Sequence, residues 1–301
     1  MTEAEFLTAL RSLPLHPGAR GLTDDTAVLD AGPLVVTTDT LVEGVHFLSG
    51  DPPGDVAWKL LATNLSDLAA KGASVEGVLL NYPLRDDAWD RAFLTGFGTA
   101  LKALGARLIG GDTVTLPPGA PRVLTLTAFG RDAAAPPRSG ARAGDALWVT
   151  GTIGDAGIGL AIAGGQTGPE RLRDAYRRPL PRLATGRLLG PQVSAMMDVS
   201  DGLLIDAARM AAASGLAVAI DLSAVPLSDA LRDFAGESRD VRLAAMTAGD
   251  DYELLFALAD GAMPAAPATR IGMFAVGSGL SLHDAGETIP LPGRLGYQHG
   301  G

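Results

Sequence analysis

Apolar residues along the chain follow two different spacings. In residues 55–71 they mark one face of a helix, which Gly72 ends; these positions are Val56, Leu60, Leu61, Leu65 and Leu68. Residues 34–38 form a continuous apolar run that ends in threonine, which is typical of a buried strand. The chain is therefore expected to contain both helices and buried strands within its first 80 residues.

The same reading extends to the rest of the chain. In the first half it predicts helices at residues 3–12, 55–71 and 86–104, and strands at residues 26–30, 34–38, 75–80, 108–109 and 123–129. In the second half it predicts strands at residues 146–150, 193–198, 218–221, 252–258 and 272–276, a small-residue helix ending at Gly164, and helices near 182–190 and 202–214. The tail from residue 290 is expected to be irregular.

Strands and helices alternate in both halves, so each half is expected to be an α/β or α+β layer structure. The Pro- and Gly-containing segment 136–140 is the best candidate for a linker. A chain of 301 residues is long enough for two domains of ordinary size, each with its own core. We therefore predict an N-terminal domain at residues 1–136 and a C-terminal domain at residues 137–301.

Aspartates stand where several of the short apolar runs stop. They are Asp24, Asp25, Asp39, Asp112, Asp198 and Asp201. Asp67 is different, because it falls on or beside the apolar face of a predicted helix, where a free carboxylate is costly. Taken singly, most of these residues are explained as turn formers or helix caps. Together they suggest that carboxylates converge on one rim of a sheet, where hard oxygen ligands suit Mg²⁺ and phosphate.

The composition of the chain excludes several classes of binding partner and of chemistry. The net charge of -10 argues against nucleic acid, whose phosphates need a basic face. The chain has no cysteine, which excludes disulfides, thiolate metal sites and a cysteine nucleophile. With no basic N-terminal region and no apolar run near the length of a membrane span, we expect no membrane partner and a cytoplasmic protein.

Phosphate chemistry here has to proceed with little lysine. Only Lys59, Lys71 and Lys102 are present, and none follows a glycine, so the Gly-Lys-Ser/Thr signature is missing. If the chain moves phosphoryl groups, metal ions must neutralise most of the charge. In-line phosphoryl transfer depends on positioning and electrostatic stabilisation, so a group of Mg²⁺ ions is sufficient for it.

Other segments suit a phosphate ligand. Gly110-Gly111-Asp112-Thr113 places flexible backbone amides beside a carboxylate. The glycine-rich segment 151–157 opens a helix after a strand, so its amides suit an anion, although packing against the sheet explains its glycines equally well. His46 follows Asp39 closely enough to contact a substrate, and Arg138 in the linker is a candidate phosphate ligand or simply a solvated side chain.

The ordered set of these segments resembles the thiamine-monophosphate kinase family, in the superfamily that includes aminoimidazole ribonucleotide synthetase. The matching segments are 24–25, 38–40, 44–47, 64–70, 110–113, 138–140, 149–155, 198–202, 250–254 and 296–297. The resemblance implies ATP-dependent phosphorylation of thiamine monophosphate to thiamine diphosphate, with several Mg²⁺ ions. It also implies an N-terminal sheet domain that forms a homodimer, and a C-terminal α/β domain that completes an active-site cleft.

The resemblance also assigns roles to individual residues. It implies that the metals are held by Asp25, Thr38, Asp39, Asp67, Asp112, Asp198 and Asp201. It implies that ATP is contacted by Gly111, Asp112, Arg138 and Ser200. His46, Asp250 and Tyr297 are expected to line the thiamine phosphate pocket. No residue is expected to act as a covalent nucleophile or a general base.

The chain departs from the family pattern at three places. Residues 21–25 read Gly-Leu-Thr-Asp-Asp in place of the usual Gly-Ile-Gly-Asp-Asp, so a glycine beside the metal ligands is lost. Asp250 replaces the usual glutamate and is one methylene shorter. The aromatic residue often found before the Gly-Gly-Asp strand is replaced near Ala103-Leu104, so adenine stacking there is not expected.

Rival interpretations share the fold. Selenophosphate synthetases and the hydrogenase-maturation dehydratase rely on cysteine or selenocysteine, which this chain lacks. An aminoimidazole ribonucleotide synthetase fits the context of His46 and of residues 250–254 less well. A different class is a non-catalytic scaffold that binds a Mg-nucleotide without turnover. It predicts lost metal ligands, whereas all the aspartates are present.

Overall fold

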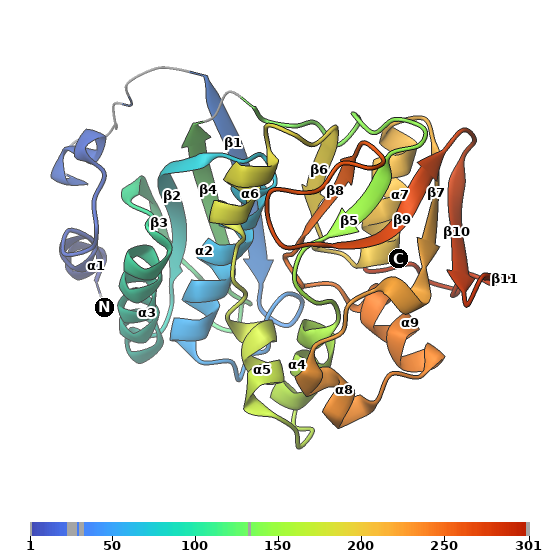
Figure 1. Ribbon diagram of the computed structural model, residues 1–301. Coiled ribbons are helices and arrows are strands. Elements are labelled where there is room, and N and C mark those ends of the chain that lie inside the picture. Colours follow the sequence, from blue (N-terminus) through green and yellow to red (C-terminus); the bar gives the residue numbers. More distant parts are fainter. Residues whose placement is uncertain (1, 23–28, 30–32, 132–133, 299–301) are drawn as a thin grey trace. The chain divides into compact units, whose positions relative to one another are not determined.

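The computed structural model describes residues 2–22, 29, 33–131 and 134–298 (Figure 1). It divides into two compact units, Met1–Leu68 with Ala73–Ala133, and Ala69–Gly72 with Ala134–Gly301. The division falls just before the predicted linker at residues 136–140. The predicted strand at residues 26–30 lies outside the described residues, except for residue 29.

The first unit combines a four-stranded sheet with helices. Its elements are α1 (Glu3–Leu10), the 3-10 helix η1 (Pro17–Leu22), β1 (Leu34–Val42), α2 (Pro53–Ala69), β2 (Ser74–Leu84), α3 (Asp87–Leu104), β3 (Leu108–Thr115) and β4 (Val123–Arg131). The strand order is β1-β4-β2-β3. Strands β2 and β3 are parallel and are connected through α3, and the other pairs are antiparallel.

Helix α3 shows how local sequence sets these elements. It begins after Asp86, whose side chain accepts a hydrogen bond from the main-chain N–H of Trp89 at 2.8 Å. It ends at Gly105, which has a φ of 69° and so adopts the left-handed conformation of a helix C-terminus. Between these ends Phe93 and Phe97 lie on the buried face. The structure confirms the helix predicted at residues 86–104.

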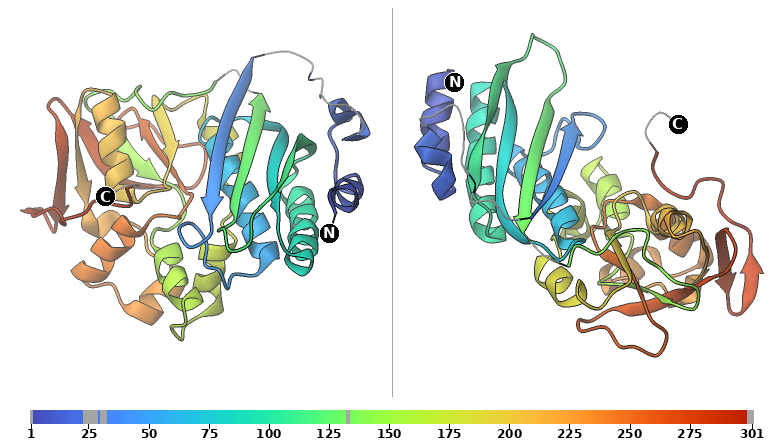
Figure 2. Two further views of the ribbon diagram at one scale, coloured as in Figure 1. Left: turned by 180° about the vertical axis from the view of Figure 1, so that it is seen from behind. Right: turned by 90° about the horizontal axis from the view of Figure 1, so that it is seen from above.

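The two faces of the four-stranded sheet have different surroundings. Helices α2 and α3 lie on one face (Figure 1). Leu80, Leu124 and Leu126 are buried, and their strand pairing places them with Asp39 and Leu41 on that face. The view from behind shows strands β1 and β4 without a helix in front of them (Figure 2, left). Alternate residues of β1 are exposed on that open face, and Val36 retains 54% of its accessible surface. We call this surface, formed by the open sides of the four strands, the open face.

The second unit is built on a seven-stranded mixed sheet. Its helices are α4 (Asp155–Ala163), α5 (Glu170–Arg177), α6 (Leu183–Leu189), α7 (Leu203–Ala213), the 3-10 helix η2 (Leu222–Ala224), α8 (Asp229–Ala235) and α9 (Arg239–Ala248). Its strands are β5 (Ala146–Val149), β6 (Ala195–Asp198), β7 (Ala217–Asp221), β8 (Leu254–Leu258), β9 (Thr269–Ala275), β10 (Gly279–Asp284) and β11 (Glu287–Ile289). The strand order is β11-β10-β7-β9-β5-β8-β6.

Separate apolar clusters hold the second unit together. Helix α7 contributes Leu203, Leu204 and Met210 to the largest of them, which also contains strand residues such as Leu255 and Phe274. A second cluster includes Leu189 of α6 with Met196, Leu254 and Phe256 of the strands. A smaller cluster joins α5, α8 and α9. Among the described residues, no helix is long and apolar enough to cross a membrane.

Helices α2 and α3 approach each other closely at a glycine pair, which gives a test of the packing. A Cβ atom on Gly96 would lie 2.3 Å from the Cα atom of Gly54, so Gly96→Ala must push the two helices apart. We expect Gly96→Ala to lower the free energy of unfolding by about 1–3 kcal/mol, although alanine is favoured in helices by about 1 kcal/mol.

Urea unfolding of Gly96→Ala and of Gly50→Ala checks this expectation. A Cβ atom on Gly50 would meet nothing within 4 Å. The control variant should therefore stay within about 0.5 kcal/mol of the parent protein. A stabilised Gly96→Ala variant would contradict the close approach.

Candidate active site

Two carboxylates meet on the helix-covered face of the first unit. Asp39 lies on β1, and Asp67 lies in the last turn of α2, which ends at Ala69. The sequence predicted a mid-helix carboxylate because the predicted helix extended to residue 71. The hydroxyl of Thr37 donates a hydrogen bond to Asp67, and the main-chain N–H of Asp39 donates to Oδ1 of Asn64 at 3.0 Å. Burial and the neighbouring charge of Asp67 raise the pKa of Asp39 to about 6.

The donor set of this pair fits a hard divalent cation. Within the described part of the chain, no ion pair connects Asp39 or Asp67 with a basic side chain. Carboxylate oxygens without a positive partner are the ligands that Mg²⁺ prefers. The described residues contain no group of three or more acidic or histidine side chains that could hold a metal. Asp25, and Asp24 beside it, lie outside the described residues.

In the folded structure of one chain, Asp112 lies far from Asp39 and Asp67. The sequence predicted that Asp39 and Asp112 stand at strand ends on one rim, and this prediction is wrong. Both residues lie inside their strands, and β1 and β3 are the opposite edges of the sheet. Thr40, Thr125, Asn81 and Asp112 pair in one row across the four strands. Three strand spacings therefore separate Asp112 from β1, or about 14 Å.

Asp112 and Asp39 also face different sides of the sheet. Paired residues of neighbouring strands share a face, so Asp112 shares the open face with Thr40. Asp39 is the next residue along β1 and faces the helices. Thr38 points to the open face too, where its hydroxyl donates to the carbonyl of Leu126 at 3.1 Å. The strands run further than the apolar segments predicted, and this extension moves both aspartates away from the sheet rim.

Gly111 precedes Asp112 at a position that only glycine can occupy. A Cβ atom built on Gly111 would lie 1.8 Å from the carbonyl oxygen of Leu80 on β2. The main chain of β3 at Gly111 therefore packs directly against the main chain of β2. The pairing of β2 with β3 also shifts register next to Leu79. Both Gly111 and Asp112 are exposed. The segment therefore has an exposed main chain that a phosphate can approach, and an exposed carboxylate that can hold a metal ion beside it.

His46 lies in a tight loop directly after β1. Its Nδ1 accepts a hydrogen bond from the main-chain N–H of Val42 at 3.0 Å, which leaves the ring proton on Nε2. Its carbonyl oxygen accepts a hydrogen bond from Nζ of Lys59 at 3.1 Å. Lys59 retains 2% of its accessible surface, so this hydrogen bond ties the loop to a lysine in the core. The ring thus presents an N–H donor, which suits a phosphate oxygen.

In the second unit, the turn after β6 gathers three predicted residues. Asp198 ends the strand, and Ser200 and Asp201 follow it. The main-chain N–H groups of Ser200 and Asp201 both donate to Oδ2 of Asp206, each at 3.1 Å. Arg209 forms ion pairs with both Asp201 and Asp206. Burial, partly offset by these donors, raises the pKa of Asp206 to about 6.

Asp250 and Tyr297 join the same turn through backbone hydrogen bonds. The N–H of Asp250 donates to the carbonyl of Ser200, and the N–H of Tyr297 donates to the carbonyl of Asp201, each at 2.8 Å. Asp250 and Tyr252 adopt positive φ values of 62° and 52°, which are strained for residues with side chains. The hydroxyl of Tyr252 donates to Asp250 Oδ1 at 2.9 Å. Five predicted residues of the second unit are thus brought together: Asp198, Ser200, Asp201, Asp250 and Tyr297.

The glycine-rich segment 151–157 is already occupied by protein groups. The N–H of Gly154, at the start of α4, donates to Oδ1 of Asp251 at 2.8 Å. Oδ2 of Asp251 is buried and has no hydrogen-bond partner among the described residues. Burial raises the pKa of Asp251 well above its ordinary value, and the charges of Glu253, Asp155 and Asp250 add to this effect although the Gly154 N–H opposes it. Arg138, the predicted phosphate ligand of the linker, is exposed.

Sequence reasoning missed the residues that hold the loops. Asp206 is fully buried in the first turn of α7, and Lys59 and Asn64 are buried on α2. The argument used for Asp67, that a carboxylate on an apolar helix face needs a reason, applies equally to Asp206 and would have found it. Lys59 gave no comparable signal, because a lysine side chain ordinarily reaches solvent.

Comparison with known proteins identifies the class of this fold. Residues 23–131 match the family described as AIR synthase related protein, N-terminal domain, and residues 142–276 match its C-terminal domain. These two matches cover the strands and helices that carry the predicted aspartates in both units. The class is therefore that of the two-domain AIR synthase-related proteins, with mixed α/β structure in each half, as the sequence predicted.

Individual relatives narrow the class further. A thiamine-monophosphate kinase of Caulobacter vibrioides is 38% identical over 309 residues, which cover 94% of this chain and 86% of the relative. The crystal structure of a thiamine-monophosphate kinase from Stenotrophomonas maltophilia is 39% identical, with a TM-score of 0.78 and coverage of 89% and 91% of the two chains. AaThiL complexed with AMPPCP and TMP is 29% identical, with a TM-score of 0.78 and 91% coverage of both chains. The chain belongs to the thiamine-monophosphate kinase family.

The buried Asp251 gives a pH-dependent prediction. Because its native pKa lies above that of the unfolded chain, the native state binds the proton more tightly, and stability falls as the pH rises above the ordinary aspartate value near 3.8. Asp251→Asn removes this titration and keeps an acceptor for Gly154. We expect the variant to be more stable than the parent at pH 8 and to lose that advantage towards pH 4.

Urea unfolding at pH 4, 6 and 8 measures the effect. Asp145→Asn is a matched control, because Asp145 is also buried but accepts hydrogen bonds from the N–H of Arg142 and the hydroxyl of Ser194. It should cost about 1 kcal/mol at pH 6 and 8. If both variants lose stability to the same degree at pH 8, the raised pKa of Asp251 is not the cause of the pH dependence.

Proposed function

We propose that this protein transfers the γ-phosphoryl group of ATP to thiamine monophosphate, forming thiamine diphosphate and ADP. The observation that carries the proposal is the likeness to thiamine-monophosphate kinases over 94% of the chain. The binding of AMPPCP and TMP by the related AaThiL supports the same pair of substrates. The proposed metal and ATP residues Asp39, Asp67, Asp112, Asp198, Asp201 and Ser200 all stand in the sequence where the family motifs place them.

Several Mg²⁺ ions are part of the proposal. They would be held by Asp25, the Thr38 segment, Asp39, Asp67, Asp112, Asp198 and Asp201, and when bound they neutralise charge on the phosphates of ATP. The side chain of Thr38 points to the open face, whereas Asp39 faces the helices. In this proposal Thr38 therefore contributes main-chain atoms on the side of Asp39. Gly111, Arg138 and Ser200 are assigned to ATP. Among the described residues, neither Asp39 nor Asp67 forms an ion pair with a basic side chain, and this supports the assignment.

The reaction needs no strong base in the protein. An oxygen of the acceptor phosphate is ionised at neutral pH and attacks the γ-phosphorus in line. A new P–O bond forms, the bond from the γ-phosphorus to the bridging oxygen breaks, and ADP leaves with the electron pair. Nε2–H of His46 donates to the acceptor phosphate and orients it, and Asp250 and Tyr297 are also assigned to the binding of thiamine monophosphate. We assign the protein to the cytoplasm.

The separation of Asp39 and Asp112 leads us to propose a site shared between two copies of the chain. One Mg²⁺ ion binds oxygens at about 2.1 Å, so two residues about 14 Å apart in one chain cannot both bind it. The open face carries Asp112 together with exposed apolar residues, among them Val36, Val114 and Val123. Pairing of open faces in a homodimer buries these side chains and brings Asp112 of one copy towards the site of the other.

Product analysis tests the proposed activity. The protein is incubated with ATP, Mg²⁺ and thiamine monophosphate, with free thiamine and no acceptor as controls. We expect thiamine diphosphate to form in step with ADP. ADP without thiamine diphosphate would move the search to another acceptor, as in an aminoimidazole ribonucleotide synthetase-like enzyme. ATP binding without turnover would favour the alternative that the protein is a non-catalytic scaffold that binds a Mg-nucleotide.

Mixing of inactive variants tests the shared site. Asp39→Asn and Asp112→Asn should each lower kcat by about 100-fold or more, because each removes a metal ligand. In a mixed homodimer, one of the two sites keeps both residues. Co-refolded variants should therefore recover about a quarter of the parent activity. Absence of recovery, with mixed dimers verified by mass spectrometry, would place both residues in a site within one chain.

His46→Ala tests the acceptor contact separately. Loss of one hydrogen bond to a phosphate should raise KM for thiamine monophosphate about tenfold and leave kcat within about twofold. The control is His283→Ala, because His283 lies on β10 and bonds to Ser281 and Thr288. An equal loss in both kinetic parameters for His46→Ala would contradict the assignment.

A further inference from the structure

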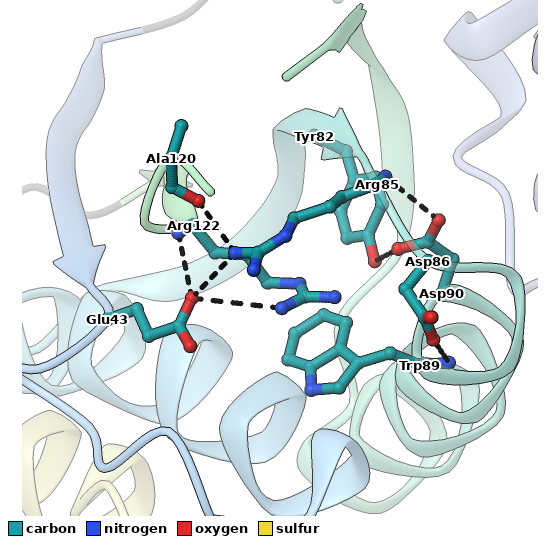
Figure 3. Close-up of polar contacts among 8 residues, drawn as sticks. All are labelled: Glu43, Tyr82, Arg85, Asp86, Trp89, Asp90, Ala120 and Arg122. Carbon is teal, nitrogen blue, oxygen red and sulfur yellow. Dashed lines mark hydrogen bonds and ion pairs between the residues drawn. The ribbon is translucent and has the colours of Figure 1, made fainter. Parts of the chain in front are cut away.

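A cluster of charged residues surrounds the end of β1 and is formed by Glu43, Arg85 and Arg122 (Figure 3). We call these three residues the Glu43 clamp. The main-chain N–H of Arg122 donates to Oε2 of Glu43 at 3.0 Å, and the N–H of Glu43 donates to the carbonyl of Arg122 at 2.9 Å. Nη1 of Arg85 donates to the same Oε2 at 3.3 Å, and Nη1 of Arg122 lies 3.7 Å from it. One carboxylate oxygen thus receives donors from two separate segments.

The clamp rests on a rigid support. The guanidinium of Arg122 lies 4.0 Å from the ring centroid of Trp89 on α3, and Arg122 retains 6% of its accessible surface. Nη1 of Arg85 also donates to the carbonyl of Ala120 at 2.6 Å. The main chain of Arg85 is fixed by Asp90, which in turn accepts a hydrogen bond from the hydroxyl of Tyr82 (Figure 3). Strand β2, helix α3 and the start of β4 therefore all hold Glu43.

Glu43 begins the short loop that carries His46. Within it, Gly44 N–H donates to the carbonyl of Phe47 at 2.8 Å, and Phe47 is buried. The loop is tied to α2 by the hydrogen bond from Lys59 to the carbonyl of His46. On its other side, it is tied to β4 and the β2–α3 connection through Glu43. The position of the His46 ring therefore depends on both ties.

Glu43 is charged at neutral pH. Burial raises the pKa of Glu43, but the hydrogen bonds from Arg122 and Ser49 and the positive charges of Arg122 and Arg85 outweigh burial and lower it below its ordinary value. If the carboxylate is neutralised, the buried guanidinium of Arg122 loses its counter-charge. Its Nε already lacks a hydrogen-bond partner among the described residues. The clamp then loosens at the point where the loop begins.

We propose that Glu43, held by Arg122 and Arg85, is a positioning residue for His46. By fixing the start of the loop, it places the Nε2–H donor of His46 for the acceptor phosphate. Glu43 itself makes no contact with substrate in this proposal. The inference rests on the proposed role of His46 in acceptor binding.

The same sheet carries a matched control at its other end. Glu76 of β2 accepts hydrogen bonds from the guanidinium of Arg131 at 2.8 Å and lies 3.0 Å from Nε2 of His16. Its side chain is 16% exposed, and that of Glu43 is 14% exposed. Residue 131 pairs with Leu34 at the start of β1, whereas Glu43 follows the last residue of that strand. The two glutamates are thus similarly exposed and both contact arginine, but only Glu43 begins the loop that carries His46.

Steady-state kinetics of Glu43→Gln and Glu76→Gln, with thiamine monophosphate varied, tests the proposal. We expect Glu43→Gln to raise KM for the acceptor about fivefold, with kcat and KM for ATP within about twofold of the parent. Glu76→Gln should lower thermal stability to a similar degree without changing KM. If Glu43→Gln does not fold, Arg85→Gln removes a partly exposed arm of the clamp and should raise KM about twofold to threefold. Equal KM values in the Glu43 and Glu76 variants would overturn the proposal.

The double variant His46→Ala/Glu43→Gln separates the two assignments. If Glu43 acts through His46, KM of the double variant should equal that of His46→Ala alone. Multiplied effects would show that Glu43 acts independently and would overturn the inference. If His46→Ala leaves KM unchanged, the proposed role of His46 fails first.

A spectroscopic readout needs no substrate. The chain has four histidines, so the ring resonances of His46 can be assigned by comparison with His46→Ala. Glu43→Gln should shift and broaden the His46 resonances, whereas Glu76→Gln should shift those of His16. Unchanged His46 resonances in Glu43→Gln would contradict positioning even if KM for the acceptor rises.

Discussion

Carboxylates that lie close together repel one another, and this protein must hold several of them in place with only three lysines in the chain. In the first unit, neutral side chains do this, because the hydroxyl of Thr37 donates to Asp67 and the amide oxygen of Asn64 accepts from the main-chain N–H of Asp39. In the second unit, Asp206 accepts two backbone N–H groups, and Arg209 lies between Asp206 and Asp201. The pKa of Asp39 is raised to about 6, first by burial and then by the neighbouring charge of Asp67. A cation that binds there relieves the repulsion, so the cost in folding is also a source of affinity.

Arginine–glutamate clusters fix both ends of the four-stranded sheet. Glu76 with Arg131 holds one end, and the Glu43 clamp holds the other. Each of these partly buried glutamates contacts side chains from more than one segment, so the geometry is determined by several polar contacts and not by a single ion pair. Between these ends, the open face presents exposed threonines and valines, a composition that suits contact with another protein surface.

Long periodic segments were predicted well from the sequence. Helices α2 and α3 and strand β4 lie where their apolar spacing placed them, because burial of one face dominates their energy. Helices α5, α8 and α9 and strands β10 and β11 were not predicted. Helix α8 has 7 residues and strand β11 has 3, so their own patterns are too short to decide the structure, and packing decides it.

The sequence by itself determined the residue types of the site, the family and the two-unit organisation, since the order of the aspartate-containing segments is fixed along the chain. It also indicated that Asp67 is a helix carboxylate on or beside the apolar face, and the structure places it in the last turn of α2, partly buried. Only the tertiary structure decided which of these residues meet. Strand order places Asp39 and Asp112 on opposite edges of one sheet, and the alternation of side chains turns them to opposite faces. Strand neighbours are chosen by the packing of the whole sheet, and no local spacing of residues encodes them.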